Sequence, residues 1–203
     1  MTHKQQTTAI APEAIVYIQL KIPSDISVVD IPVGVSLSDI IQERISLEVQ
    51  GEAVEISEEY PTPILMAVFD VVHKVSPEMV LQLKSGKRIL LFDHWGAPVL
   101  RDKNIHVIHK IKEHKKSGGF VPELIIDLEA IWKKANEEEN DLEAIKNALQ
   151  KVEKLLKPSM VTTLIGKAPA LLFLLTQHLL YGKTAEIWYQ ESLAHTAIRI
   201  ALL

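Results

Sequence analysis

The sequence predicts a single α/β (α+β) domain, in which a mixed β-sheet is covered by helices. Short β-branched or apolar runs alternate with longer segments of helical periodicity, and prolines mark where several helices begin. Hairpin patterns separate some of the runs, so parallel and antiparallel strands are both expected. A hydrophobic fraction of 47% in 203 residues suffices for one sizeable core. We expect this domain over residues 13–203, after a flexible tail over residues 1–12.

Composition narrows the classes of partner and compartment. The formal net charge of −4 provides no overall positive field to attract double-stranded nucleic acid or a membrane surface. The chain has no cysteine, which removes disulfides and thiolate metal sites and fits a reducing compartment. No apolar signal core opens the chain, and charged or polar residues interrupt its most apolar stretch, residues 160–181. We therefore expect a cytoplasmic protein without a membrane span.

In the first half of the chain, local patterns predict both strands and helices. Alternating or apolar runs predict strands over residues 15–22, 45–49, 53–56, 88–92, 97–100 and 105–111. The second and third of these are joined by Gln50-Gly51-Glu52 and are interpreted as a hairpin. Helix start patterns predict a short turn after Ser36 and helices over residues 64–75, capped by Thr62, and 79–84, after Ser76-Pro77.

In the second half, a helical hairpin insertion is expected over residues 122–157. Pro122 is taken to start the first helix, and Asn140-Asp141 the second, each with one apolar face. The remaining elements are a strand over 161–165, a turn over 166–169, a helix over 170–180, and strands over 185–189 and 196–202.

The order of elements hints at a duplication. Residues 53–100 and 160–202 both contain a strand, a proline-marked helix, a strand, a turn and a strand. The two segments share hydrophobic pattern far more than identity, so chance similarity of two α/β units is the favoured interpretation.

The turn Gly166-Lys167-Ala168-Pro169 is the main candidate for a ligand site. A helix N-terminus presents free N–H groups and the positive end of its dipole, which suits an anion, and Lys167 adds a charge. A tight structural connection is the alternative interpretation. The turn lacks the glycine spacing and the Lys-Ser/Thr ending of a Walker loop.

The segment from Val161 to Ile200 resembles the core of small CRISPR-associated accessory proteins of type III systems. These include the ring nucleases, which bind and cut cyclic oligoadenylates. The resemblance covers about a fifth of the chain, and the residues that follow the pattern are Gly166, Lys167, Pro169, His178 and Tyr189.

This resemblance implies a role in antiviral defence as a nucleotide-binding homodimer whose symmetric ring ligand is cut without a metal or other cofactor. The family's acidic residue after the tyrosine is Gln190 here, and its arginine two positions further on is Ser192. The chain therefore matches the binding function better than the cleavage function. The expected ligand-binding residues are Gly166, Lys167, Ala168, Pro169, Gln190 and Ser192; no catalytic residue and no metal ligand is assigned.

Two other functions stay open: a non-catalytic interaction or assembly module that uses the hairpin 122–157, and an unrecognised small-molecule enzyme. His106, His109 and His114 do not have the spacing of a metal site. For the basic loop from Lys110 to Gly119, a phosphate site is one interpretation and a solvated charge run is the favoured one. His178 is expected to be a packed core histidine, and Asp70 and His73 a surface pair.

Overall fold

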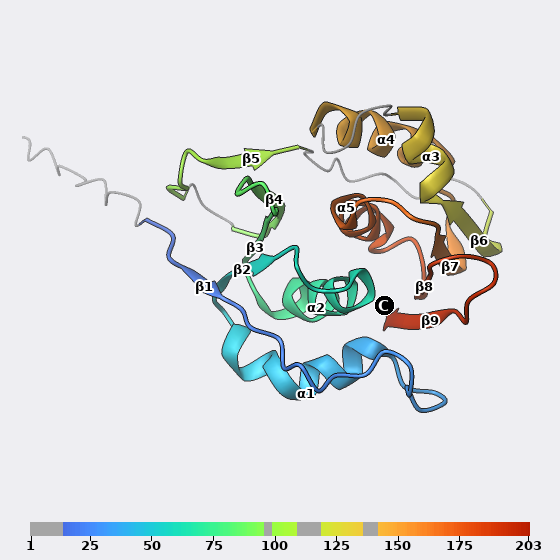
Figure 1. The fold of residues 1–203 in the computed structure, drawn as a ribbon, viewed down its shortest axis with the longest axis horizontal. Coiled ribbons are helices and arrows are strands. Elements are labelled where there is room, and N and C mark those ends of the chain that lie inside the picture. Colours follow the sequence, from blue (N-terminus) through green and yellow to red (C-terminus); the bar gives the residue numbers. More distant parts are fainter. Residues whose placement is uncertain (1–13, 96–98, 109–118, 136–141) are drawn as a thin grey trace, which may run out of the picture.

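The computed structural model describes residues 14–95, 99–108, 119–135 and 142–203, which form two mixed β-sheets and five α-helices (Figure 1). The strands are β1 (Tyr17–Gln19), β2 (Ala53–Ser57), β3 (Glu78–Gln82), β4 (Arg88–Asp93) and β5 (Ile105–Val107) in the first sheet, and β6 (Val121–Asp127), β7 (Ser159–Ile165), β8 (Glu186–Gln190) and β9 (Ile198–Leu202) in the second, each in that spatial order. The helices are α1 (Leu37–Val49), α2 (Thr62–Val75), α3 (Leu128–Ala135), α4 (Leu142–Leu155) and α5 (Ala170–Leu180). The predicted fold class is confirmed, with the strands divided between two sheets.

The two sheets contain the same strand–helix–strand–strand unit. In β2–α2–β3–β4 the first two strands are parallel and the last two antiparallel, and β7–α5–β8–β9 repeats this order. Ala53 pairs with Glu78 in the first unit, and Val161 pairs with Glu186 at the same offset in the second. The antiparallel pairs even share an irregularity between the second and third residues of β3 and of β8. Chance similarity of pattern is therefore the wrong interpretation, because topology, register and bulge position all repeat.

The two units pack on each other through their central helices. Figure 1 shows α2 and α5 in the middle, with strands of one sheet on either side. Each helix also contacts the last strand of the other unit, α2 with β9 and α5 with β4. Gln177 donates a hydrogen bond from Nε2 to the carbonyl of Met66 (3.0 Å), and the Tyr181 hydroxyl donates to Asp70 (2.7 Å). One continuous apolar core therefore joins the units.

The hairpin predicted around residues 45–56 is wrong in its first strand, because residues 37–49 form helix α1. A capping box starts this helix: the Asp39 N–H donates to the Ser36 hydroxyl, and the Ser36 N–H donates to the Asp39 carboxylate. Ile45 and Val49 are buried whereas Leu47 is 91% exposed, which is the pattern of a helix face.

The helix predicted over residues 79–84 is also wrong, since these residues belong largely to strand β3. Met79, Val80 and Leu81 are all buried, as expected of a strand that is covered on both faces. Ser76 ends α2 instead of starting a new helix. Its N–H donates to the carbonyl of Val72 and its hydroxyl donates to that of Val49.

The prediction of a helix beginning at Pro122 is wrong as well. Residues 121–127 form β6, which runs parallel to β7 at the edge of the second sheet. A proline is tolerated on an edge strand because its missing N–H leaves no ladder bond unmade. The helix begins only at Leu128, and α4 follows with a buried apolar face.

The other predicted elements lie close to their expected places. Helix α5 spans the expected residues, and β1, β4, β5, β7, β8 and β9 all fall within the predicted strands or overlap them. Helix α2 is present too, but no side chain caps it and Thr62 is its first residue. Leu100 forms an isolated bridge with Ala14, while the tail 1–12, residues 96–98 and most of the basic loop 110–119 lie outside the described residues. None of the helices in the described ranges combines the length and apolar character needed to cross a membrane.

Candidate functional site

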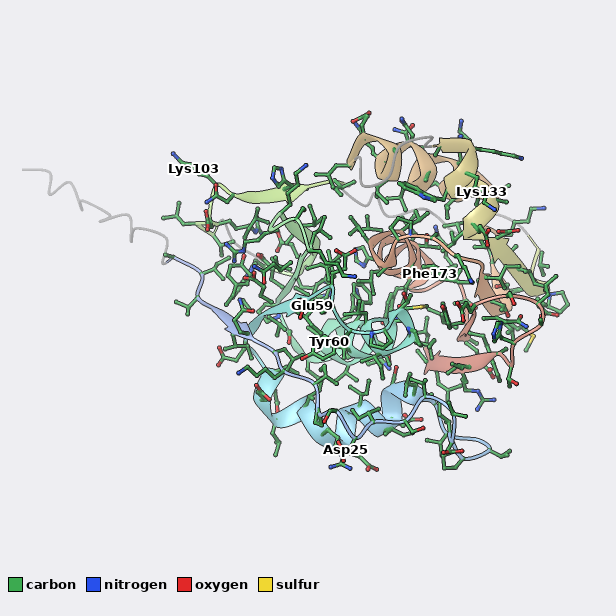
Figure 2. All side chains as sticks on the ribbon, in the orientation of Figure 1. Asp25, Glu59, Tyr60, Lys103, Lys133 and Phe173 are labelled. Atoms are coloured by element: carbon green, nitrogen blue, oxygen red, sulfur yellow. The ribbon has the colours of Figure 1, made fainter. Side chains whose placement is uncertain are left out.

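A cavity of about 410 Å³ lies where the two units present the same structural element, the turn between a parallel strand and the next helix. Its walls are formed by Glu58, Thr62, Trp132, Gly166, Lys167, Ala168, Pro169, Phe173, Tyr189 and Glu191. Figure 2 labels Phe173 on α5, which lines the cavity, and Glu59, which follows the lining residue Glu58 in the first turn. Both turns follow the carboxyl end of a parallel strand, the position at which open α/β sheets bind ligands.

Gly166 allows a close approach between the second turn and α3. Its φ angle is +98°, and a Cβ atom there would lie 2.5 Å from the Cβ of Glu129 and 3.0 Å from its backbone nitrogen. The Gly166 N–H donates to the carbonyl of Gln190 (3.1 Å), which continues the β7–β8 ladder. Only glycine fits this position without displacing α3.

Lys167 places its ammonium group at the mouth of the cavity. Its side chain is 70% exposed, and Nζ lies 3.6 Å from the carboxylate of Glu191. An exposed pair of this kind contributes little, so a stronger anion can replace Glu191 as the partner of Lys167.

The backbone N–H of Lys167 is already bonded. It donates to the Glu129 carboxylate at 3.0 Å, and Lys133 donates to the same group at 2.5 Å. The bond from Lys133, followed by the one from the Lys167 backbone, lowers the pKa of Glu129. The backbone N–H of Lys167 is therefore not among the donors that this turn can offer to a phosphate.

Both helix N-termini at the cavity lack a side-chain cap. Pro61 precedes α2 and Pro169 precedes α5, and neither can supply a capping oxygen. No side chain therefore caps the first backbone N–H groups of either helix. These groups lie at the cavity together with the positive ends of two helix dipoles.

Aromatic rings and carboxylates complete the walls. Tyr189 packs edge-on against Phe173 (5.4 Å between ring centroids), and Trp132 comes from α3. Burial, and then the charge of Glu191, raise the pKa of Tyr189, so its hydroxyl stays protonated and can donate. The carboxylate of Glu58 accepts the Lys84 N–H at 2.9 Å, so both acidic groups in the walls have partners.

Gln190 and Ser192 lie beside the cavity without lining it. Gln190 donates from Nε2 to the carbonyl of His195 (2.6 Å), and the Ser192 hydroxyl lies 2.7 Å from Nδ1 of the same histidine. These bonds brace the β8–β9 loop, which carries Glu191. Of the six residues predicted from sequence, four line the cavity and two hold one of its walls.

Sequence reasoning missed the contributions of the first unit. Glu58 and Thr62 line the same cavity as Lys167, although they precede it by more than a hundred residues. The repeated pattern was the indication available, because Pro61 and Pro169 occupy corresponding positions before the two central helices.

A second, larger cavity of about 820 Å³ adjoins the first. It is formed by the loop 28–35 before α1, the start of α2, and the ends of β8 and β9. Thr62, Tyr189 and Glu191 line both cavities, so the two are neighbours.

The histidines do not form a metal site in the part of the chain that the structure describes, where no three histidine or carboxylate groups converge on one point. His73 lies instead in an aromatic cluster, stacked on Tyr181 (4.0 Å) and near His94 (4.5 Å) and His178 (5.2 Å). The predicted surface pair of Asp70 and His73 is wrong, because Asp70 is buried and bonds to Lys74 and Tyr181.

Comparison with known proteins adds one distant similarity. No family model matches the chain, and no curated protein matches it. Among solved structures, the chain is similar to the Acinetobacter baumannii Cap4 SAVED/CARF-domain containing receptor with the cyclic trinucleotide 3'3'3'-cAAA, with a TM-score of 0.41 and 15% identity. The match covers 73% of this chain and 38% of that receptor. This similarity is too low to transfer a fold or a ligand, so the proposals below depend on the chain's own residues.

Proposed function

We propose that this chain binds a nucleotide second messenger of the cyclic oligoadenylate class in the cavity between its two repeated units. One observation carries the proposal: two strand-to-helix turns, one from each unit, meet around a cavity that is lined by an exposed lysine and three aromatic side chains. Such a combination suits a ligand with both phosphates and flat rings.

The phosphate of the ligand would be held by charge and by backbone groups. Lys167 provides the mobile cation at the mouth, and the uncapped N-termini of α2 and α5 provide N–H donors. The bases would lie against Trp132 and Tyr189, since aromatic faces stack on any base. The adenine identity is what the sequence resemblance implies.

A single chain supplies both turns, so the proposed site does not require a second copy. The homodimer expected from sequence rested on a symmetric ring meeting the same turn twice. In this chain the two units present corresponding turns within one polypeptide. We propose one ligand per chain, and the homodimer stays a separate prediction.

Cleavage of the ring is the less supported part of the function. A metal-independent reaction would need the ligand's 2′-hydroxyl held in line with the scissile phosphate. Gln190 and Ser192 stand where the related nucleases carry an acidic residue and an arginine, and both are bonded to His195. We propose that binding, in the setting of CRISPR antiviral defence, is the main activity.

The alternative of an assembly module rested on the apolar stripes of the helical hairpin 122–157 and on the missing catalytic residues. In α4, Ile145, Leu149 and Val152 are buried in the core of the protein. This face is therefore already covered, and it gives no support to a partner surface.

Replacing Lys167 with alanine should weaken binding of a cyclic oligoadenylate by about 10-fold to 100-fold, because a hydrogen bond to a charged group contributes about 1.5–3 kcal/mol. Stability should change little, since Lys167 is exposed and loosely paired. Titration calorimetry with cyclic tri- and tetra-adenylate measures the affinity.

Lys103→Ala is the matched control for Lys167→Ala. Lys103 is exposed, and Figure 2 shows it at the far end of the first sheet from the cavity. Equal affinities of the Lys167 variant and of the control would contradict the role assigned to Lys167.

A further inference from the structure

We propose that the second cavity binds a second nucleotide unit of the same ligand, whose phosphate meets Arg199. The inference rests on the proposed function and extends it, because it requires a ligand of at least two nucleotide units. Such a ligand would span both cavities and cross Tyr189 between them.

The two cavities are adjacent and share three lining residues. Thr62 at the start of α2, Tyr189 at the end of β8 and Glu191 just beyond it line both. A chain of nucleotides can therefore pass from one cavity to the other without leaving the protein surface. The second cavity, at about 820 Å³, is within the range of pockets that enclose a small molecule.

Arg199 is the cation of the second cavity. Its guanidinium lies over the ring of Trp188, 5.1 Å from the centroid, and its Nε atom is 3.4 Å from the carboxylate of Glu186. The side chain is 25% exposed. No acceptor within the described ranges of the chain bonds to the two Nη groups. A fixed guanidinium with two unused donors matches the geometry of a phosphate.

The opposite wall is apolar and held in place. It consists of Val28, Ile31, Val35 and neighbouring residues of the loop 28–35, together with Pro61 and Pro63. A bond from the Val35 N–H to the carbonyl of Pro32 (3.1 Å) closes a turn in this loop. The capping box of α1 then fixes its end. A wall of this kind suits the face of a base, while Arg199 lies on the other side.

The acidic group at the junction, Glu191, competes with a ligand phosphate for the charge of Lys167. Glu191 lies 3.6 Å from Lys167 and 4.0 Å from Nε2 of His195. A ligand that takes over Lys167 therefore leaves Glu191 next to His195, at the exposed edge of the junction.

Two tryptophans allow each cavity to be followed separately. Trp132 lines the first cavity and Trp188 the second, whereas Trp95 donates to Glu78 and lines neither. The probes are AMP, linear 5′-phosphorylated diadenylate and cyclic triadenylate. We expect the two oligonucleotides to change the fluorescence of both Trp132→Phe and Trp188→Phe, because each variant keeps one reporter. AMP should change the fluorescence of only one variant.

Affinity provides the second readout. Arg199→Gln should weaken diadenylate binding tenfold or more and leave AMP binding within about threefold, because the first cavity is intact. Arg44→Gln on α1 is the matched control, since that arginine is exposed and its ion pair with Asp25 (3.5 Å) lies away from both cavities' lining residues. Thr196→Glu provides a second test, because Thr196 is exposed and lines the second cavity. Its added carboxylate should also weaken diadenylate selectively.

Three results would overturn the inference. Equal losses of affinity for AMP and for diadenylate in Arg199→Gln would make the second cavity the primary site. Unchanged diadenylate affinity in both Arg199→Gln and Thr196→Glu would leave the second cavity without a role. Absence of binding by every nucleotide to the unmodified protein would remove the proposed function itself.

Discussion

Replacing Gly166 with alanine is expected to lower the free energy of unfolding by about 2–6 kcal/mol and to abolish ligand binding. A positive φ of +98° costs a non-glycine residue roughly 1–3 kcal/mol. The new Cβ would also stand 2.5 Å from the Cβ of Glu129 and 3.0 Å from its backbone nitrogen, which forces α3 to shift at a further cost of about 1–3 kcal/mol. Because α3 carries Trp132, the shift also deforms the cavity. Urea unfolding and ligand titration measure the two effects.

The matched control is Gly182→Ala. Gly182 follows α5 with a φ of +72°, and a Cβ there meets no atom within 4 Å. This variant should show the cost of the backbone conformation alone and should bind ligand normally. Equal losses of stability in the two variants would show that contact with α3 contributes nothing.

The second large effect is a loss of stability in acid that depends on His73. Burial, followed by the charges of His178, His94 and Lys74, lowers the pKa of His73 from 6.5 to about 3. The folded protein therefore keeps His73 neutral, whereas the unfolded chain binds a proton below about pH 6.5. The unfolded state binds more protons in the window from about pH 6.5 to 3, so the free energy of unfolding decreases there as the pH is lowered. The contribution reaches ~2.5–3 kcal/mol at pH 4.5.

His73→Phe should remove this contribution, since phenylalanine can pack against Phe92 and Tyr181 without an ionisable group. Urea unfolding at pH 7.5, 6.5, 5.5 and 4.5 should show a smaller loss of stability in the variant than in the unmodified protein. His106→Phe, at an exposed position on β5, controls for the loss of one imidazole. Parallel pH profiles for His73→Phe and the unmodified protein would disprove the assignment.

The elements predicted correctly are those whose local pattern and tertiary environment agree. Helix α5 is apolar except for Thr176, Gln177 and His178 and is flanked by a proline and by Tyr181-Gly182, so its bounds follow from sequence. Strand β4 is a continuous apolar run and is buried in the middle of its sheet.

The errors arise where one residue pattern fits two structures. Ile45, Leu47 and Val49 alternate as in a strand, yet Ile45 and Val49 also stand one helical turn apart. The exposure of Leu47 decides between them, and only tertiary structure shows it. A proline such as Pro122 is typical of a helix start, so the local pattern favours a helix there. The pairing of β6 with β7, which makes this segment a strand, is a long-range contact that no local pattern reveals.

For the candidate site, sequence indicates the second turn but not its counterpart. Lys167 and Gly166 stand out by residue type and by the helix that follows. Glu58 and Thr62 become recognisable only when the two units are seen to meet. Arg199 has no sequence pattern around it, and its position over Trp188 depends on the register of β8 and β9.

The central claim, that the chain binds an oligonucleotide second messenger, is tested most directly by thermal unfolding with and without cyclic tri-, tetra- and hexa-adenylate, linear diadenylate and AMP. A ligand at a hundred times its dissociation constant stabilises the folded state by about 2.7 kcal/mol, which raises the midpoint by several degrees in a domain of this size. We predict such a rise with at least one cyclic species, and a smaller rise or none with AMP. An unchanged midpoint with every nucleotide, at concentrations up to the millimolar range, would contradict the claim.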